Sequence, residues 1–542
     1  MPKNEGELCP LSLTLSNSST ENISMPEDSV KNGELIRSSG VVSLLTMVSR
    51  VFGLLRDVVI ANVFGSGAGA DAFFVALRIP NLFRRLFAEG AFSQAFVPVL
   101  SAYRERRTRS EVRLLVSRVS GTLGLSLLLI TILGVLGAEY IMRIFAFGYV
   151  YHAETEKLAL ATEMLRLTFP YLLLISLTAF AGAILNTYGR FAVPAFTPVL
   201  LNLSLIVCVI ALRPYLDQPI MALAWAVLVA GVAQLTMQLP FLAKEDLLVA
   251  PTIHTKDPGV RRILTLMLPA LFGVSVGQIN ILLDTVLASF LETGTLSWLW
   301  YSDRLLELPL GIFAIAIATV ILPGLSQDHA TASKQQFSHT LNWALRLVCL
   351  LGLPASAALI YLSDELIATL FFHGAMTERD VTMSGLALAA YGTGLLGHML
   401  VKVLLPGYFA RQDTSTPVKF GVIALFSNMI LNLALIWHFK HAGLALATSF
   451  SAFINAGLLV YGLKSSGVLV FEAEWGRFFF RILIATLIML SIVSLITPNI
   501  ENWFEFGNLE RVLRMLFICF VGIGFYIIGL LVLGIKVNQV IR

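Results

Sequence analysis

Charged residues are scarce in this chain. Asp, Glu, Lys and Arg make up only 13% of its 542 residues, whereas 57% of the residues are hydrophobic and the mean hydropathy is +0.80. Soluble globular domains carry about 25% charged residues. The composition therefore predicts a polytopic membrane protein rather than a set of soluble domains.

Cysteine is scarce as well, and its positions exclude two kinds of structure. The four cysteines, Cys9, Cys208, Cys349 and Cys519, lie far apart and form no CxxC pair. This spacing indicates neither a disulfide framework nor a cysteine-based metal site. The formal net charge is only +4. In a membrane protein such a small basic excess indicates cytoplasmic loops, so no nucleic-acid partner is expected.

Several motifs of enzymes and ATPases are missing from the sequence. The chain has no GxxxxGK[ST] P-loop, so it is not expected to use ATP directly. It also lacks a DDxxD cluster, an HExxH motif and a GxSxG motif near the membrane surface. These absences argue against a membrane enzyme that acts on polyprenyl phosphates. We expect no catalytic residues and no organic cofactor.

The first 39 residues differ from the rest of the chain. They are rich in Ser, Asn, Glu and Lys, and no apolar segment follows a basic start as it would in a cleaved signal peptide. We interpret residues 1–39 as a disordered polar cytoplasmic extension.

The remainder consists of long apolar runs. A membrane-spanning helix needs about 20 apolar residues, and a run isolated in lipid must be helical to satisfy its backbone hydrogen bonds. We predict fourteen spans, at residues 41–64, 71–100, 114–138, 158–187, 193–213, 219–242, 262–291, 297–324, 337–362, 383–410, 417–437, 441–463, 477–497 and 511–534.

The distribution of Lys and Arg predicts the orientation. Basic residues concentrate in the loops at 103–113 and 243–262, whereas the loops at 363–380 and 498–510 are acidic. Because cytoplasmic loops carry the excess of Lys and Arg, both termini are expected in the cytoplasm of a bacterial inner-membrane protein.

The sequence contains a weak internal repeat. RDVVIANVFGSG (56–67) aligns with LDTVLASFLETG (283–294), which matches Asp57 to Asp284, and LLNLSLI (200–206) resembles ILNLALI (430–436). The matches occur in the same order in both halves. They predict an all-α fold of two pseudo-symmetric six-helix lobes, residues 40–242 and 243–463, followed by two helices in residues 464–542. Transporters of this design bind substrate between the lobes.

Charged residues lie inside several of the predicted spans. Inserting each centrally placed charge into the membrane costs about 2.5–3.5 kcal/mol. We interpret Arg50, Arg56, Arg84 and Arg304 as lining a polar cavity. For Asp57 a structural ion pair with Arg56 and a functional role remain equally open, and Arg78, Arg85 and Glu89 either snorkel or face the cavity. A cavity lined by arginine would suit a phosphate or diphosphate, because the guanidinium fork binds these groups in a bidentate manner.

Four stretches, residues 46–100, 169–202, 300–311 and 402–419, closely resemble the MurJ (MviN) lipid II flippase family. That family belongs to the multidrug/oligosaccharidyl-lipid/polysaccharide exporter superfamily. The resemblance implies fourteen helices in two lobes, and a transporter that moves lipid II, an undecaprenyl-diphosphate-linked disaccharide pentapeptide, to the periplasmic leaflet for cell-wall synthesis. It also implies lipid-tail binding by the last two helices and the cell-wall synthesis machinery as a candidate partner.

The resemblance also assigns roles to individual residues. Those matching the family's substrate-binding positions are Arg50, Arg56, Asp71, Arg84 and Arg304, and those matching cavity or gate positions are Glu89, Asp303, Glu307 and Lys402. Some family members use sodium. Here Asp284, Asn432 and Thr448 offer the oxygen ligands that a hard cation requires. Polar bridging between packed helices explains the same three residues, and membrane potential is the rival driver.

Two other functions remain to be weighed. Another lipid-linked oligosaccharide exporter or a drug/cation antiporter of the same superfamily would share the fold, but a drug site should be lined by acids and aromatics rather than by arginines. A scaffold protein would have no reason to bury so many arginines.

Overall fold

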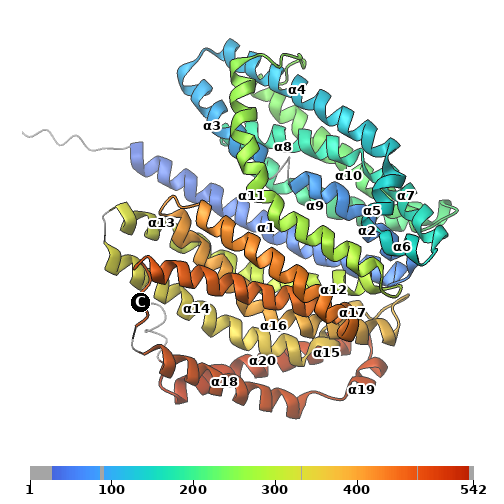
Figure 1. The fold of residues 1–542 in the computed structure, drawn as a ribbon, viewed down its shortest axis with the longest axis vertical. Coiled ribbons are helices and arrows are strands. Elements are labelled where there is room, and N and C mark those ends of the chain that lie inside the picture. Colours follow the sequence, from blue (N-terminus) through green and yellow to red (C-terminus); the bar gives the residue numbers. More distant parts are fainter. Residues whose placement is uncertain (1–26, 86–90, 331–332, 473, 536–542) are drawn as a thin grey trace, which may run out of the picture.

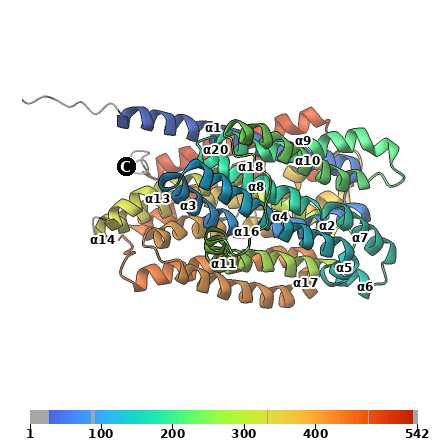
Figure 2. The same ribbon diagram turned by 90° about the horizontal axis from the view of Figure 1, so that it is seen from above.

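The computed structural model describes residues 27–85, 91–330, 333–472 and 474–535, and within these ranges the chain forms helices and no β-strand. Figures 1 and 2 show the long helices running side by side in a common direction. In Figure 1 most helices of the first half gather on one side of the molecule and most of the second half on the other, and α11 extends from the first group toward the second. An all-helical membrane bundle is thus confirmed.

The helices of the first half are α1 (Glu27–Phe64), α2 (Ala68–Phe83), α3 (Ala91–Arg106), α4 (Arg109–Leu136), α5 (Ala138–Phe145), α6 (Phe147–Tyr151), α7 (Thr155–Thr168), α8 (Tyr171–Thr187), α9 (Ala192–Leu212), the 3-10 turn η2 (Arg213–Tyr215) and α10 (Met221–Lys244). The helix α1 begins at Glu27 and therefore includes residues 27–39, which the sequence analysis assigned to the disordered extension.

The second half comprises α11 (Pro258–Ser289), α12 (Thr295–Pro309), the π-helical turn η3 (Leu310–Ala314), α13 (Ile315–Ala330), α14 (Lys334–Tyr361), α15 (Ser363–Phe371), α16 (Glu378–Phe409), α17 (Ser415–Ser465), α18 (Trp475–Ile496), α19 (Ile500–Glu505) and α20 (Asn508–Val532). The helix α16 packs on α14, α12 and α17, and α18 packs on α20 and α14.

Ten helical segments in the described part of the chain are long and apolar enough to cross a membrane. The predicted span 41–64 falls within α1, and the span 262–291 overlaps α11 as far as Ser289; neither helix is among those ten. The range 71–100 contains residues 86–90, which are not described. The count of fourteen and the two-lobe layout stay predictions.

The predicted spans 417–437 and 441–463 form one 51-residue element, α17. The chain reverses at Lys440, whose φ of 49° and ψ of −127° lie outside the helical region. A side chain at Gly443 would overlap the backbone of Leu435, so the glycine permits the close approach of the two arms. The two spans are therefore joined without a loop.

The segment between α10 and α11 packs closely against α4. Thr252 N–H donates to the carbonyl of Ser117 at 2.9 Å, and a side chain at Gly121 would overlap the backbone of Thr252. Asp257 then caps α11 by accepting from the N–H groups of Gly259 and Val260, and it pairs with Arg118 of α4. These contacts hold the start of α11 against the first half of the chain.

The helices α14, α18 and α20 enclose an apolar cavity of about 540 Å³. Its lining includes Leu350 and Pro354 of α14, Met489 of α18, and Gly522 and Tyr526 of α20, and it contains no charged side chain. This cavity lies where the sequence analysis expected a groove for a lipid tail.

Arg511 fastens the beginning of α20 to its surroundings. Its side chain is 5% exposed. It donates to the carbonyl of Trp503 at 2.9 Å, to that of Phe372 at 2.8 Å and to that of Phe504 at 2.9 Å. Because carbonyls alone satisfy the guanidinium, Arg511 holds α15, α19 and α20 together without a carboxylate.

Candidate functional site

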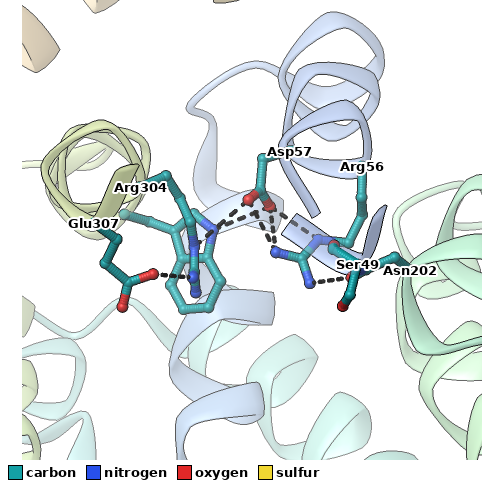
Figure 3. Close-up of polar contacts among 7 residues, drawn as sticks. Ser49, Arg56, Asp57, Asn202, Arg304 and Glu307 are labelled. Carbon is teal, nitrogen blue, oxygen red and sulfur yellow. Dashed lines mark hydrogen bonds and ion pairs between the residues drawn. The ribbon is translucent and has the colours of Figure 1, made fainter. Parts of the chain in front are cut away.

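Asp57 of α1 is at the centre of a buried ionic cluster (Figure 3). Its side chain is completely buried, and it accepts hydrogen bonds from Arg56 Nη2 at 2.7 and 2.9 Å and from Arg56 Nε at 3.0 Å. Arg56 also donates to Asn202 Oδ1 of α9 at 3.0 Å, and Asn202 donates to the Ser49 carbonyl. The ion pair between Arg56 and Asp57 that the sequence left open is therefore present.

Asp57 also joins α1 to α12. Arg304 Nε lies 3.5 Å from Asp57 Oδ2, and Trp300 Nε1 donates to Asp57 Oδ1 at 3.3 Å. Arg304 stacks over the Trp300 ring at 4.5 Å and donates to Glu307 at 2.7 Å. One carboxylate thus holds two guanidinium groups that are 248 positions apart in the sequence.

Next to this cluster lies a cavity of about 400 Å³, here called the Arg50 cavity. It brings together five of the predicted site residues from α1, α12 and α16. Its cationic side chains are Arg50, Arg56, Arg304 and Lys402, and its carboxylates are Asp57 and Glu307. Within the described residues, Arg50 and Lys402 make no hydrogen bond or ion pair with protein.

A second cavity of about 410 Å³, here called the Arg84 cavity, shares Arg56, Arg304 and Glu307 with the first. Its other charged side chains are Arg78, Arg84, Arg85, Asp284 and Asp303. Arg84 donates to Asn81 at 3.3 Å, and Arg78 donates to Thr285 of α11. The predicted site residue Glu89 lies outside the described residues.

Asp71 lines neither of these two cavities. It lies at the first turn of α2 and accepts from Gly294 N at 2.7 Å, from Ser297 N at 3.0 Å and from Ser297 Oγ at 2.7 Å. These donors belong to the N-terminus of α12, which has no side-chain cap of its own. Asp71 therefore caps α12 from another helix, which satisfies its free N–H groups and its positive dipole.

The sequence analysis missed Lys157, the counter-charge of Asp71. Lys157 is 7% exposed, and its Nζ lies 3.4 Å from Asp71 Oδ2 and 3.4 Å from Glu154 Oε2. It also donates to Thr293 at 3.2 Å and lies over the Tyr149 ring. Because Lys157 stands alone just before a predicted span, no sequence signal distinguished it from a loop lysine.

The three residues proposed for sodium lie close together, and Asn428 joins them. Asn432 donates to Asp284 Oδ1 at 2.6 Å and to Asn428 Oδ1 at 2.7 Å, and Asn428 donates to Thr448 at 3.3 Å. Among the described atoms, the side-chain oxygens of Asn432 and Asn280 are buried without a hydrogen-bond partner. No group of three or more His, Cys, Asp or Glu that could hold a metal occurs in the described part of the chain. One carboxylate among amides suits a monovalent cation.

The chain is similar to known proteins over nearly its whole length. The model of a family described as "Lipid II flippase MurJ" matches residues 60–532. A "Probable lipid II flippase MurJ" of Vibrio cholerae is 47% identical over 510 residues, covering 93% of this chain and 97% of the relative. A "Lipid II flippase MurJ" of Burkholderia cenocepacia is 41% identical, covering 86% and 91%.

Solved structures give the same picture. One described as "Lipid II flippase MurJ, inward closed conformation" is 29% identical, with a TM-score of 0.78 over 92% of this chain and 99% of that one. An inward-facing multidrug transporter of the MATE family is 14% identical, with a TM-score of 0.61 over 79% of this chain and 98% of that one, and it supports the fold alone.

Proposed function

The chain belongs to the MurJ family of lipid II flippases, and from this premise we propose that it carries lipid II across the bacterial inner membrane by alternating access, with the diphosphate held in the Arg50 cavity. As a member of this family it is a transporter rather than an enzyme. The proposed direction is from the cytoplasmic to the periplasmic leaflet, with both termini cytoplasmic.

The charges of the Arg50 cavity carry this proposal. Asp57 and Glu307 neutralise Arg56 and Arg304 through the contacts described above. Arg50 and Lys402 remain, so the cavity has two more cations than carboxylates. A diphosphate supplies the missing negative charge, and a guanidinium binds phosphate oxygens through charge-assisted hydrogen bonds.

The origin of these two cations supports alternating access. Arg50 belongs to α1, in the first half of the chain, and Lys402 belongs to α16, in the second half. A diphosphate between them attracts both helices, so its binding favours the arrangement in which the two halves lie close together. A ligand shifts a conformational equilibrium only through such a difference in affinity.

The remaining parts of lipid II have separate surroundings in this proposal. The Arg84 cavity adjoins the Arg50 cavity and offers amide and carboxylate groups to the sugar and peptide. The apolar cavity between α14, α18 and α20 suits a prenyl chain, because it exposes no charged group.

Substituting the two unneutralised cations tests the proposal. We expect Arg50→Ala and Lys402→Ala each to weaken binding of lipid II by about tenfold, and the double variant by about a hundredfold, as expected for lost charge-assisted contacts. Binding is measured with purified full-length protein in nanodiscs. Growth rescue of flippase-depleted cells, with membrane levels checked, measures transport.

Arg514→Ala is the matched control, because this exposed arginine of α20 lines neither arginine cavity and, among the described residues, forms its ion pair with Glu510 on its own helix. Wild-type affinity in the double variant would remove the diphosphate site from the Arg50 cavity. A drug/cation antiporter predicts the opposite response: removal of the two positive charges should then improve the binding of a lipophilic cation.

We further propose that sodium binds at the cluster formed by Asp284, Asn428, Asn432 and Thr448. The internal repeat supports this site. In the first half, Asp57 and Asn202 hold the guanidinium of Arg56. The repeat places Asp284 and Asn432 at the corresponding positions of the second half, but the position of Arg56 is taken by Leu283. The second half therefore repeats the two ligands without the arginine, and Arg78 nearby donates its hydrogen bond to Thr285 instead. Bound sodium would replace the missing guanidinium.

Thermal unfolding in sodium and in choline chloride tests this site. If sodium binds the folded protein, a concentration of 100 times its dissociation constant stabilises that state by about 2.7 kcal/mol. We expect Asp284→Asn to lose this stabilisation and Asp303→Asn, a carboxylate of the same cavity, to keep it. An equal sodium response in wild type and Asp284→Asn would show that sodium does not bind at Asp284. Membrane potential would then be the remaining candidate for the driving force of transport.

A further inference from the structure

The connection between α12 and α13 is a single π-helical turn, η3, at the wall of the Arg50 cavity. The turn comprises residues Leu310–Ala314 and follows directly on Pro309. Proline cannot donate to the α-helical ladder, and π-turns are rare elements that occur mostly at functional sites. The turn places Gly311 in the cavity lining.

Gly311 occupies a position at which a side chain would collide with Arg50. A Cβ atom built there overlaps the guanidinium, and its three nearest neighbours are Nη1, Cζ and Nη2 of that group. The guanidinium of Arg50 therefore rests directly on the backbone of η3. This contact joins α1 to the second half of the chain.

The contact explains how Arg50 is placed without being neutralised. Arg56 and Arg304 are positioned by carboxylates, which cancel their charges. Arg50 has no carboxylate partner among the described residues. Packing against a bare backbone fixes the position of the guanidinium and leaves its charge available for an anion.

We propose that Gly311 is a positioning residue for Arg50: the absence of a side chain in η3 lets the guanidinium occupy the cavity wall where it meets the diphosphate. This inference rests on the proposed function of the Arg50 cavity. Gly311 itself contacts no substrate in this arrangement, and it acts only through Arg50.

The expected effect of Gly311→Ala is a loss of affinity with the fold retained. The atoms in the way are the far end of a flexible side chain, so Arg50 moves aside and the backbone need not shift. A displaced guanidinium no longer makes its full set of charge-assisted hydrogen bonds with a phosphate group. Because Gly311 acts only through Arg50, the loss cannot exceed that of Arg50→Ala. We expect affinity for undecaprenyl diphosphate to fall by up to about tenfold, with a larger share of that loss in Gly311→Val than in Gly311→Ala.

The experiment compares Gly311→Ala, Gly311→Val, Arg50→Ala and Arg50→Ala/Gly311→Ala as purified full-length proteins in nanodiscs, with undecaprenyl diphosphate as the probe. Gly324→Ala of α13 is the control, because a Cβ atom there meets nothing within 4 Å. The double variant should bind no more weakly than Arg50→Ala, since the group that Gly311 positions is already absent. Thermal unfolding of each variant is measured in parallel.

The outcomes separate the inference from the proposed function. If Arg50→Ala weakens binding but Gly311→Ala does not, or if Gly311→Ala weakens it by the same factor with and without Arg50, the positioning role is wrong and the Arg50 cavity remains. If Arg50→Ala binds as tightly as the wild type, both the positioning role of Gly311 and the diphosphate site in the Arg50 cavity are wrong. If Gly311→Ala unfolds more readily, removal of Arg50 in the double variant should restore stability, and failure to do so also overturns the inference.

Discussion

Asp57→Ala should lower the free energy of unfolding by about 3–5 kcal/mol and abolish transport, because it leaves the buried guanidinium of Arg56 without a carboxylate and Arg304 with only the more exposed Glu307. The Asp57 carboxylate is completely buried and is the shared partner of Arg56 and Arg304. Its loss also breaks the hydrogen bond from Trp300. Unfolding of the purified protein in mixed micelles, with transport into proteoliposomes, measures both effects.

Glu307→Ala is the control for this prediction. Glu307 pairs with the same arginine, but its side chain is 45% exposed. An exposed pair contributes at most about 1 kcal/mol. Equal destabilisation by the two substitutions would show that Asp57 does not organise the cluster.

Asp71→Ala should open the end of the bundle at which α2 meets α12. The substitution removes one of the two carboxylate partners of the buried Lys157 and three hydrogen bonds to the start of α12. Each hydrogen bond to a charged group contributes about 1.5–3 kcal/mol, so the closed arrangement should lose its population by more than about a hundredfold. In the alternating-access cycle proposed above, a transporter that cannot close this end cannot complete transport.

Disulfide formation between Asn62→Cys and Ala375→Cys reports closure, because Ala375 N–H donates to the Asn62 carbonyl across this end at 2.8 Å. We expect the cross-link to form readily in an otherwise unaltered chain and to be lost with Asp71→Ala. Asp217→Ala, an exposed acid between α9 and α10, is the control and should leave the cross-link unchanged. Undiminished cross-linking with Asp71→Ala would contradict the role of Asp71 in closure.

Hydropathy predicted most of the helices because one rule applies to every apolar run in lipid: it must form a helix to satisfy its backbone hydrogen bonds. The same rule made the buried charges conspicuous, and Arg50, Arg56, Arg304 and Lys402 do meet in one cavity. Their proposed contact with substrate stays a prediction. The break between the spans 417–437 and 441–463 was predicted, but the reversal at the single residue Lys440 was not, since no cluster of turn residues marks it and the helical pattern continues on both sides.

Tertiary hydrogen bonds were the second feature that the sequence could not predict. Asp71 was predicted among the substrate-binding residues from its resemblance alone, but its partners are N–H groups of α12, which carry no sequence signal. Asn202 was present in the repeat that also contains Asn432, and asking which polar residues the two halves share would have found it. The π-turn η3 likewise became visible only in the fold, although Pro309 marks its position.

The closure around Asp71 and Lys157 has a consequence for the cell's energy supply. A polar passage open to both compartments at once would let protons and other ions run down the gradients that power the bacterium. In the alternating-access cycle proposed above, the contact between α2 and α12 must therefore exclude ions whenever the opposite end of the transporter admits lipid II, and the Asp71–Lys157 ion pair is buried within this contact.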